Sequence, residues 1–188
     1  FYNLKKIFLI TLLLCFSFCE NNKNTSNNNK KWFISTSFGM QISGIKSEDF
    51  ISSNTSPSFT LNGGLWFTEK IALLIGYKGF HFNYIYDDIK HKYNFLYSEI
   101  LFDFSKYFSK INYNSKIKLI YHQGAGYFDN KFYNKSNICS NLGVISKIKL
   151  KPYVDFYFDI SAIIGWNIYQ MNEDIIPSLN VGFIYNLK

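Results

Sequence analysis

A long alternation of side-chain character between Tyr153 and Ile168 constrains the fold of this chain more than any other feature. Every second side chain of this run is apolar, namely Val154, Phe156, Phe158, Ile160, Ala162, Ile164, Trp166 and Ile168. The positions between them carry mostly polar or small side chains, such as Asp155, Asp159 and Ser161. Successive side chains of a β-strand point to opposite faces, so the pattern predicts a strand with one apolar and one polar face. The run covers 16 residues, whereas an ordinary globular strand has about 5–6.

Seven further segments repeat the same period of two, some cleanly and some with interruptions. They are residues 32–41, 58–67, 71–83, 92–105, 116–128, 137–150 and 178–185. No segment after residue 31 carries a convincing helical period. The sequence therefore predicts an all-β fold of eight strands.

The connections between these segments alternate in length. Residues 68–70 and 151–152 form tight turns, and residues 106–115 form a medium connection on the same side. The connections on the other side are longer and polar, and they cover residues 42–57, 84–91, 129–136 and 169–177. An even strand number with short turns at one end and longer loops at the other is typical of outer-membrane barrels. We expect an eight-stranded antiparallel up-and-down transmembrane β-barrel over residues 31–188.

Alternation by itself also fits a soluble β-barrel, whose apolar face would point inward. Two features favour a membrane barrel. Aromatic residues gather near the strand ends, for example Trp66 at one end and Tyr93 and Phe128 at the other, as interfacial girdles do. The polar face is rich in Gly, Ser and Asn, which suit a narrow interior. A secreted or lipid-anchored soluble barrel that binds an apolar ligand stays open as an alternative.

The first residues predict export from the cytoplasm. Lys5 and Lys6 precede an apolar run over residues 7–18, which is shorter than the ~20 residues of a transmembrane helix. Cleavage after Cys19 would remove a signal peptide over residues 1–19 and leave an Asn-rich linker at 20–30. Lipidation of Cys19 is the alternative, and the sequence leaves both outcomes open.

The end of the chain carries a second export-related pattern. Asn180, Gly182, Tyr185 and Leu187 supply a polar, a glycine, an aromatic and an apolar position at the required spacing. This pattern resembles the C-terminal β-signal of outer-membrane proteins. The resemblance implies insertion by the barrel-assembly machinery. The chain departs from the commonest signal because it ends in Leu187-Lys188 and not in Phe.

The segment 65–73 resembles the first tight hairpin of small outer-membrane barrel domains of the OmpA/OmpX-like family. Together with the β-signal, this resemblance covers residues 31–188 at the level of pattern. It implies an integral protein in the outer membrane of a diderm bacterium.

Several charged residues on the polar face predict a network inside the barrel. They are Glu99, Asp103, Lys118, His122, Lys147, Asp155 and Asp159. Simple hairpin registers place Asp103 opposite Lys118, Glu99 opposite His122 and Lys147 opposite Asp155. Asp159 then faces Gly143 and has no direct partner. An unpaired charge in a narrow interior costs several kcal/mol, so we expect a lumen plugged by paired polar side chains. A small passive pore through this network is the alternative.

The sequence contains no pattern that predicts catalysis. His122 stands between Tyr121 and Gln123, and a catalytic base needs a nucleophile within hydrogen-bond reach. Cys139 is the only cysteine beyond residue 19, so the sequence predicts neither a disulfide nor a Cys–His metal site. We expect no enzymatic activity, no metal and no cofactor.

The charge balance points to anionic surfaces. The 20 basic residues, all lysine, outnumber the 13 acidic residues, which favours outer-membrane lipid headgroups or lipopolysaccharide as partners. Export disfavours nucleic acid. We expect a monomer with a structural, adhesion or surface-interaction role, in which the four longer loops contact a host or extracellular ligand.

Overall fold

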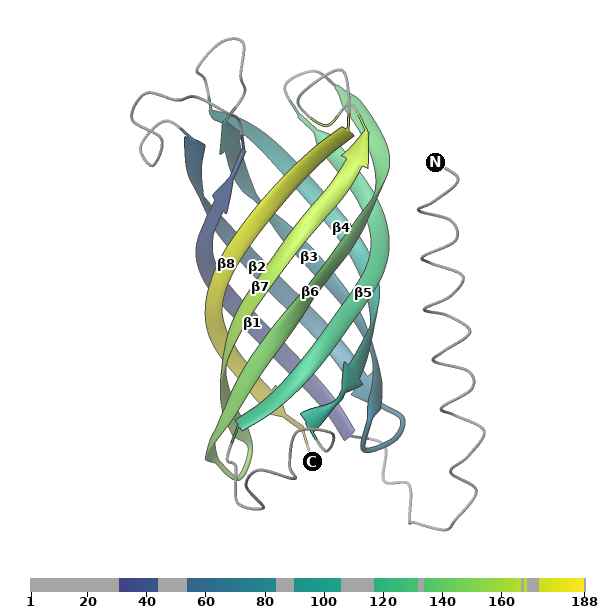
Figure 1. The fold of residues 1–188 in the computed structure, drawn as a ribbon, viewed down its shortest axis with the longest axis vertical. Helices are drawn as coiled ribbons and strands as arrows, with labels where there is room; N and C mark the ends of the chain where they lie inside the picture. The colour runs from purple at the N-terminus through teal and green to yellow at the C-terminus, as the bar shows by residue number, and fades with distance from the viewer. Residues whose placement is uncertain are drawn as a thin grey trace.

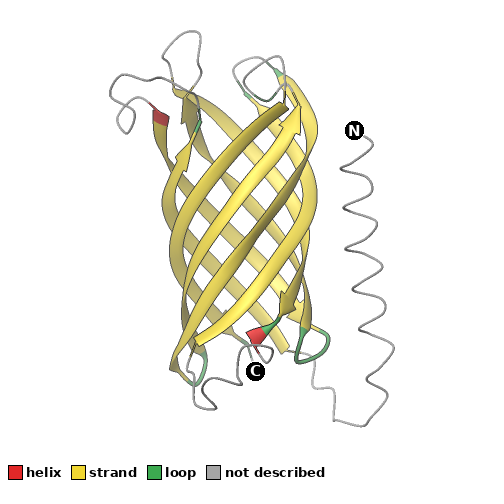
Figure 2. Cartoon of the chain, viewed as in Figure 1, coloured by secondary structure: helices red, strands yellow, loops and turns green. Residues whose placement is uncertain are grey.

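The strands of this protein close into a single barrel, as the computed structural model shows (Figure 1). The structure describes residues 31–43, 54–83, 90–105, 117–131, 134–166, 168 and 173–187. The predicted signal peptide and linker lie outside these residues, as does most of the predicted loops. Within the described residues, no helix is long and apolar enough to cross a membrane. Strands make up nearly all of this part of the chain (Figure 2).

Each strand pairs antiparallel with the next one in sequence, and β1 pairs with β8 to close the barrel. The strands are β1 (Lys31–Ile42), β2 (Thr55–Trp66), β3 (Ile71–Asn83), β4 (Lys90–Asp103), β5 (Ile117–Asn130), β6 (Lys135–Lys151), β7 (Val154–Trp166) and β8 (Glu173–Asn186). They contain 12 to 17 residues each, more than the about 9–11 that a tilted strand needs to cross a bilayer. The predicted all-β, eight-stranded up-and-down barrel is confirmed.

Several strands are longer than the alternation predicted. β5 ends at Asn130 and β6 begins at Lys135, so the long loop expected over 129–136 is wrong, and the connection is residues 131–134. Asn134 adopts a positive φ of 50°, which suits a tight reversal. β1 and β2 likewise extend into the loop expected over 42–57.

β8 begins at Glu173, five residues before the predicted strand over 178–185, and it includes Pro177. Residues 169–177 were predicted to form a loop because the segment is polar, and proline lacks the N–H donor of a strand. β8 pairs with β1 only from Ser178 onward. At Pro177 the strand is therefore an edge on that side, where proline is tolerated.

The two faces of each strand separate a polar interior from an apolar exterior. On β1, the inward residues Phe33, Ser35, Ser37 and Gln41 are at most 3% exposed, and the outward residues Trp32, Ile34, Phe38 and Met40 are 48–59% exposed. This is the reverse of a soluble protein, in which apolar side chains gather inside. The soluble-barrel alternative required the apolar faces to point inward, and the structure contradicts it.

Some aromatic residues assigned to girdles lie inside the barrel instead. Tyr93 and Phe128 are buried in the lumen, where their rings stack at a centroid distance of 4.8 Å. Trp66 also lies on the inward face of β2 and packs against Phe33. The girdle prediction is wrong for these three residues because they share the inward phase of their strands. Their bulk fills parts of the lumen that small polar side chains leave open.

Candidate functional site: a charged network in the lumen

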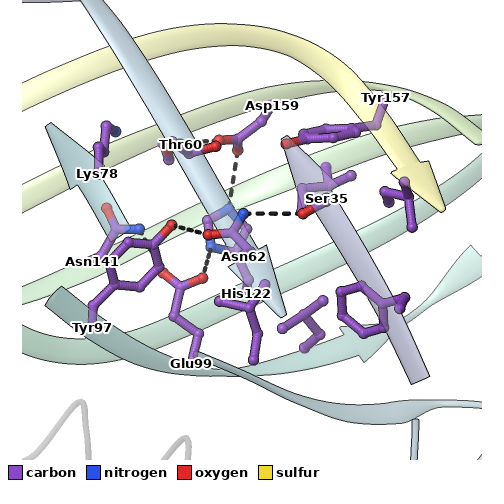
Figure 3. Close-up of a pocket in the computed structure, with 16 residues that line it drawn as sticks. Ser35, Thr60, Asn62, Lys78, Tyr97, Glu99, His122, Asn141, Tyr157 and Asp159 are labelled. Carbon is purple, nitrogen blue, oxygen red and sulfur yellow. Dashed lines mark hydrogen bonds and ion pairs between the residues drawn. The ribbon is translucent and has the colours of Figure 1, made fainter. Parts of the chain in front are cut away.

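The centre of the lumen holds a histidine between two carboxylates (Figure 3). His122 on β5 places Nδ1 at 3.1 Å from Glu99 Oε2 on β4. Its Nε2 lies 3.1 Å from Asp159 Oδ1 on β7. All three residues are buried. An ionised carboxylate only accepts hydrogen bonds, so a histidine bonded to two of them donates from both ring nitrogens and carries a positive charge.

Polar side chains from neighbouring strands complete the partners of the two carboxylates. Asn141 Nδ2 on β6 donates to Glu99 Oε1 at 2.5 Å. Ser161 Oγ donates to Asp159 Oδ2 at 2.9 Å, and Asn180 Nδ2 lies 3.5 Å from the same oxygen. Charge-assisted hydrogen bonds of this kind offset the loss of solvent around buried charges.

Lys78 on β3 supplies a second cation to this part of the lumen. It is 1% exposed, and its Nζ donates to Ser178 Oγ at 2.6 Å. With doubly protonated His122, the four charged residues Lys78, Glu99, His122 and Asp159 balance. We call these four residues the central quartet. A balanced set is what a narrow interior of low dielectric requires.

A second charged group lies nearer the end of the barrel that holds the tight turns. Lys118 Nζ lies 3.3 Å from Asp103 Oδ2, and Lys147 Nζ lies 3.2 Å from Asp155 Oδ2. Asn186 Nδ2 also donates to Asp155, at 3.2 Å. The Lys118 side chain is half exposed at the rim, whereas the Lys147 pair is buried. Both pairs are charge-balanced on their own.

The expected cross-strand registers are wrong by two residues. Glu99 is opposite Gly124 instead of His122, and Lys147 is opposite Tyr157 instead of Asp155. A shift of two keeps every side chain on the same face, so alternation cannot detect it. The bulge between Lys149 and Lys151 changes the β6–β7 register by one residue. The side chains still meet because they reach diagonally between strands.

The displaced registers extend to the other members of the network. Asp103 is opposite Ile120 instead of Lys118. Asp159 is opposite Ile145, not Gly143, and the expectation that it lacks a partner is wrong. Its partner is His122 on β5, beyond the intervening strand β6.

Sequence reasoning missed several polar residues that complete the site. They include Asn62, Lys78, Tyr97, Asn141, Ser161 and Ser178, which line the lumen or bond to its charges. Tyr97 OH donates to Asn62 Oδ1 at 2.8 Å, and Asn62 Nδ2 donates to Ser35 Oγ at 3.1 Å. The alternation along each strand could have identified them, since all of them occupy inward-facing positions. All of them except Ser178 line a cavity of about 30 Å³, which has room for about one water molecule.

The geometry around His122 shows no pairing of a base with a nucleophile. Its two ring nitrogens contact carboxylates, and the hydroxyl of Ser161 donates to Asp159. Among the described residues, no group of three or more His, Cys, Asp or Glu side chains could hold a metal ion. The network is therefore arranged to hold strands together across the lumen.

The four residues of the C-terminal pattern lie at the closure of the barrel. Asn180 is buried in the lumen and accepts a hydrogen bond from Ser58, whereas Tyr185 and Leu187 face outward. Gly182 faces inward at the seam with β1. A Cβ added there would lie 2.1 Å from the Thr36 carbonyl oxygen, so only glycine allows this close approach.

Comparison with known proteins relates the fold to one class. Neither a protein-family model nor the sequence of a curated protein matches the chain. The N-terminal β-barrel domain of Pseudomonas aeruginosa OprF superposes with a TM-score of 0.53 at 12% identity, covering 82% of this chain and 97% of that domain. Neisserial surface protein A superposes with a TM-score of 0.50 at 12% identity, covering 83% and 96%.

A third comparison is with the outer membrane protein Ail of Yersinia pestis in a phospholipid nanodisc. Its TM-score is 0.48 at 16% identity, covering 82% of this chain and 99% of that one. The fold of this chain is that of the small eight-stranded outer-membrane β-barrels. It is the OmpA/OmpX-like fold, as the patterns in residues 65–73 and 180–187 predicted.

Proposed function

We propose that this chain is an integral protein of the outer membrane of a diderm bacterium, with a structural, adhesion or surface-interaction role. The observation that carries this proposal is the apolar outer wall around a polar lumen. Apolar side chains cover most outward positions of β1, β7 and β8, and they have only lipid to contact once the polar groups are enclosed. A closed barrel also leaves no unpaired backbone in the bilayer, because every strand has two neighbours.

Aromatic residues at the strand ends support a bilayer position. Trp32, Phe67, Tyr153 and Tyr185 are exposed at the end that holds both termini of the barrel. Rings with one polar edge favour the headgroup level, so this band would lie at the periplasmic interface. The longer connections would then face the outside of the cell.

The side chains in the lumen favour a plugged interior over an open channel. The central quartet is charge-balanced, and the two lysine–aspartate pairs below it hold strands β4 to β7 together. The stack of Tyr93 and Phe128 occupies the half nearer the longer loops. In our proposal the barrel is a rigid support for its loops, and it does not catalyse a reaction.

Surface contacts would be made through the connections between β1 and β2, β3 and β4, and β7 and β8, which mostly lie outside the described residues. Lysines near the rims, such as Lys92, Lys131 and Lys151, would favour lipid phosphates or lipopolysaccharide. Export would use residues 1–19 as a cleaved signal peptide and 20–30 as a linker. Insertion would use the barrel-assembly machinery, which would read Asn180, Gly182, Tyr185 and Leu187.

Heat modifiability tests this function. The chain from Glu20 onward is diluted from urea into detergent micelles, and boiled and unboiled samples are compared on a cold gel with circular dichroism alongside. We expect a β-rich spectrum and a shifted unboiled band that form only with detergent. A monodisperse folded monomer in plain buffer would contradict a membrane barrel.

A further inference from the structure

One part of the outer wall departs from the apolar pattern. Ser98 on β4, Ala125 on β5 and Ser140 on β6 are direct cross-strand partners, and they form a continuous row of small side chains that face outward. Gln123, two residues before Ala125 on β5, also faces outward and lies near the middle of the strand. We call Ser98, Gln123, Ala125 and Ser140 the polar patch.

The opposite wall of the barrel is more uniformly apolar, since Thr36 is the one polar side chain among the outward residues 32–40 of β1. Around the seam between β1 and β8, Phe38 pairs with Val181 and Met40 pairs with Leu179. These four side chains are outward and exposed. A barrel surrounded only by lipid needs the same apolar cover on all sides, so the polar patch calls for a separate explanation.

The hydrogen-bond partners of outward polar groups sharpen the contrast. Two outward groups on β1 and β3 are satisfied within the chain: Thr36 Oγ1 donates to the Thr60 carbonyl, and Tyr77 OH donates to Asn94 Oδ1. Ser146, which faces outward on β6 as Ser140 does, has no side-chain hydrogen bond among the described residues. In the patch, Gln123 Oε1 accepts from Tyr121 OH at 2.8 Å. Its Nε2 group, by contrast, has no acceptor among the described residues.

The two serine hydroxyls of the patch are in the same situation, since neither Ser98 nor Ser140 has a side-chain hydrogen bond within the described part of the chain. Hydrocarbon offers no partner to such groups, and each unmet hydrogen bond there carries a cost. Ser98 and Ser140 flank Ala125, and Gln123 is the neighbouring outward residue on β5. Three polar side chains within this small area at bilayer depth therefore point to a protein surface opposite them.

We propose that the polar patch is the interface between two copies of this chain within the membrane. This inference rests on the proposed membrane function, and it replaces the expectation of a monomer. Both copies are inserted in the same direction, so a twofold axis relating them runs along the membrane normal. Such an axis keeps each residue at the same depth as its own copy, and a residue that lies on the axis faces its own copy.

The chemistry of the patch is suited to meeting itself. The carboxamide of Gln123 has a donor and an acceptor, so two copies pair reciprocally across the axis. The small side chains of Ser98, Ala125 and Ser140 allow the two walls to approach closely. Ile138, which is 81% exposed beside this row on β6, supplies apolar bulk that contacts the partner wall. A different protein would have to offer matching polar groups at the same depth, whereas a second copy does so by symmetry.

Disulfide cross-linking in lipid vesicles tests the interface. Ala125→Cys is made in a Cys139→Ser background, which removes the buried native thiol. The matched control is Val181→Cys on the opposite wall, in the same background. After reconstitution and mild oxidation we expect a covalent dimer from Ala125→Cys at yields at least several-fold above the control. Equal yields from both variants would overturn the proposal.

Energy transfer between labelled copies, measured while lipid dilutes the protein, tests the role of the carboxamide. Hydrogen bonds within membranes contribute modestly, so Gln123→Leu should lower the dimerisation constant about threefold to tenfold. Val181→Leu on the opposite wall should leave that constant unchanged. A monomer at all protein-to-lipid ratios would overturn the proposed dimer. Heat modifiability of the same samples separates this failure from failure of the barrel itself, because a folded monomer keeps its shifted band.

Discussion

His122 Nε2 lies 3.1 Å from Asp159 Oδ1, although the strands that carry them, β5 and β7, are separated by β6 in the barrel. The same ring contacts Glu99 on β4 through its other nitrogen. One side chain thus connects three strands across the lumen. The stability of the barrel should depend on this connection more than on the ion pair at the rim.

Substitution of His122 tests that dependence. His122→Ala leaves two buried carboxylates with only Lys78 to balance them, and breaking a buried ion pair in this way costs about 3–5 kcal/mol. The matched variant Lys118→Ala removes an exposed partner of Asp103 and should cost less than about 1 kcal/mol. Urea unfolding of both variants in the same detergent measures the difference. Equal losses of unfolding free energy would show that the central contacts stabilise the barrel no more than the rim pair does.

Closure of the barrel depends on Gly182. Gly182→Ala should destabilise the seam by about 1–3 kcal/mol, because the added methyl meets the Thr36 carbonyl. Gly63→Ala is the control, since a Cβ on that outward glycine meets nothing within 4 Å. The fraction of heat-modifiable protein after refolding measures the effect of each substitution. A normal yield from Gly182→Ala together with a loss from Gly63→Ala would contradict the described seam.

A lysine on the outer wall tests the bilayer position. Val181→Lys, near the middle of β8, should destabilise the barrel by about 2–4 kcal/mol in lipid vesicles. Tyr185→Lys, near the end of the same strand, should cost about 0–1 kcal/mol, because its charge reaches the interface. Unfolding by denaturant in vesicles provides the comparison. If the two lysine substitutions destabilised the barrel equally, the apolar outer wall would not be the surface that contacts lipid.

Planar bilayer recordings test the plugged lumen. The folded barrel should give no steady unitary conductance steps, because the central quartet and the aromatic stack fill the interior. Protein left unfolded in urea serves as the control for membrane disturbance. Reproducible steps of one size from the folded protein alone would favour the passive pore.

The fate of Cys19 is open to direct measurement. Expressed with its first residues in a diderm host, the chain should yield a mature protein that begins at Glu20. Intact mass and N-terminal peptide mapping of the membrane fraction would show this terminus. A mature chain that begins at Cys19 and carries acyl groups would establish the lipidated alternative.

The alternation of side chains predicted the eight strands and which residues share a face, because the period of two depends only on local backbone geometry. The assignment of the polar face to the interior needed a further signal, namely its small Gly, Ser and Asn side chains. Parity alone would also have placed Tyr93 and Phe128 inside. Their nearness to strand ends suggested a girdle, but Tyr93 shares the inward phase of Glu99 on β4.

Register and contacts across the lumen could not be predicted in the same way. A slip of two residues leaves every face unchanged, so the positions of Glu99 and His122 in their strands fit either pairing. The contact between His122 and Asp159 depends on the stagger of the closed barrel, which is a property of all eight strands together. Loop lengths near Pro177 were misjudged because strand pairing there is one-sided.

The seam between β1 and β8 also has a consequence for how the chain is made. β1 has one neighbour in β2 and finds its other neighbour only in β8, the last of the eight strands in sequence. The amide of Leu187 bonds to the Trp32 carbonyl, so the ring closes only when β8 is in place. Any product of interrupted translation would keep two open strand edges, which invite aggregation. Both edges are therefore covered only after β8 has paired with β1.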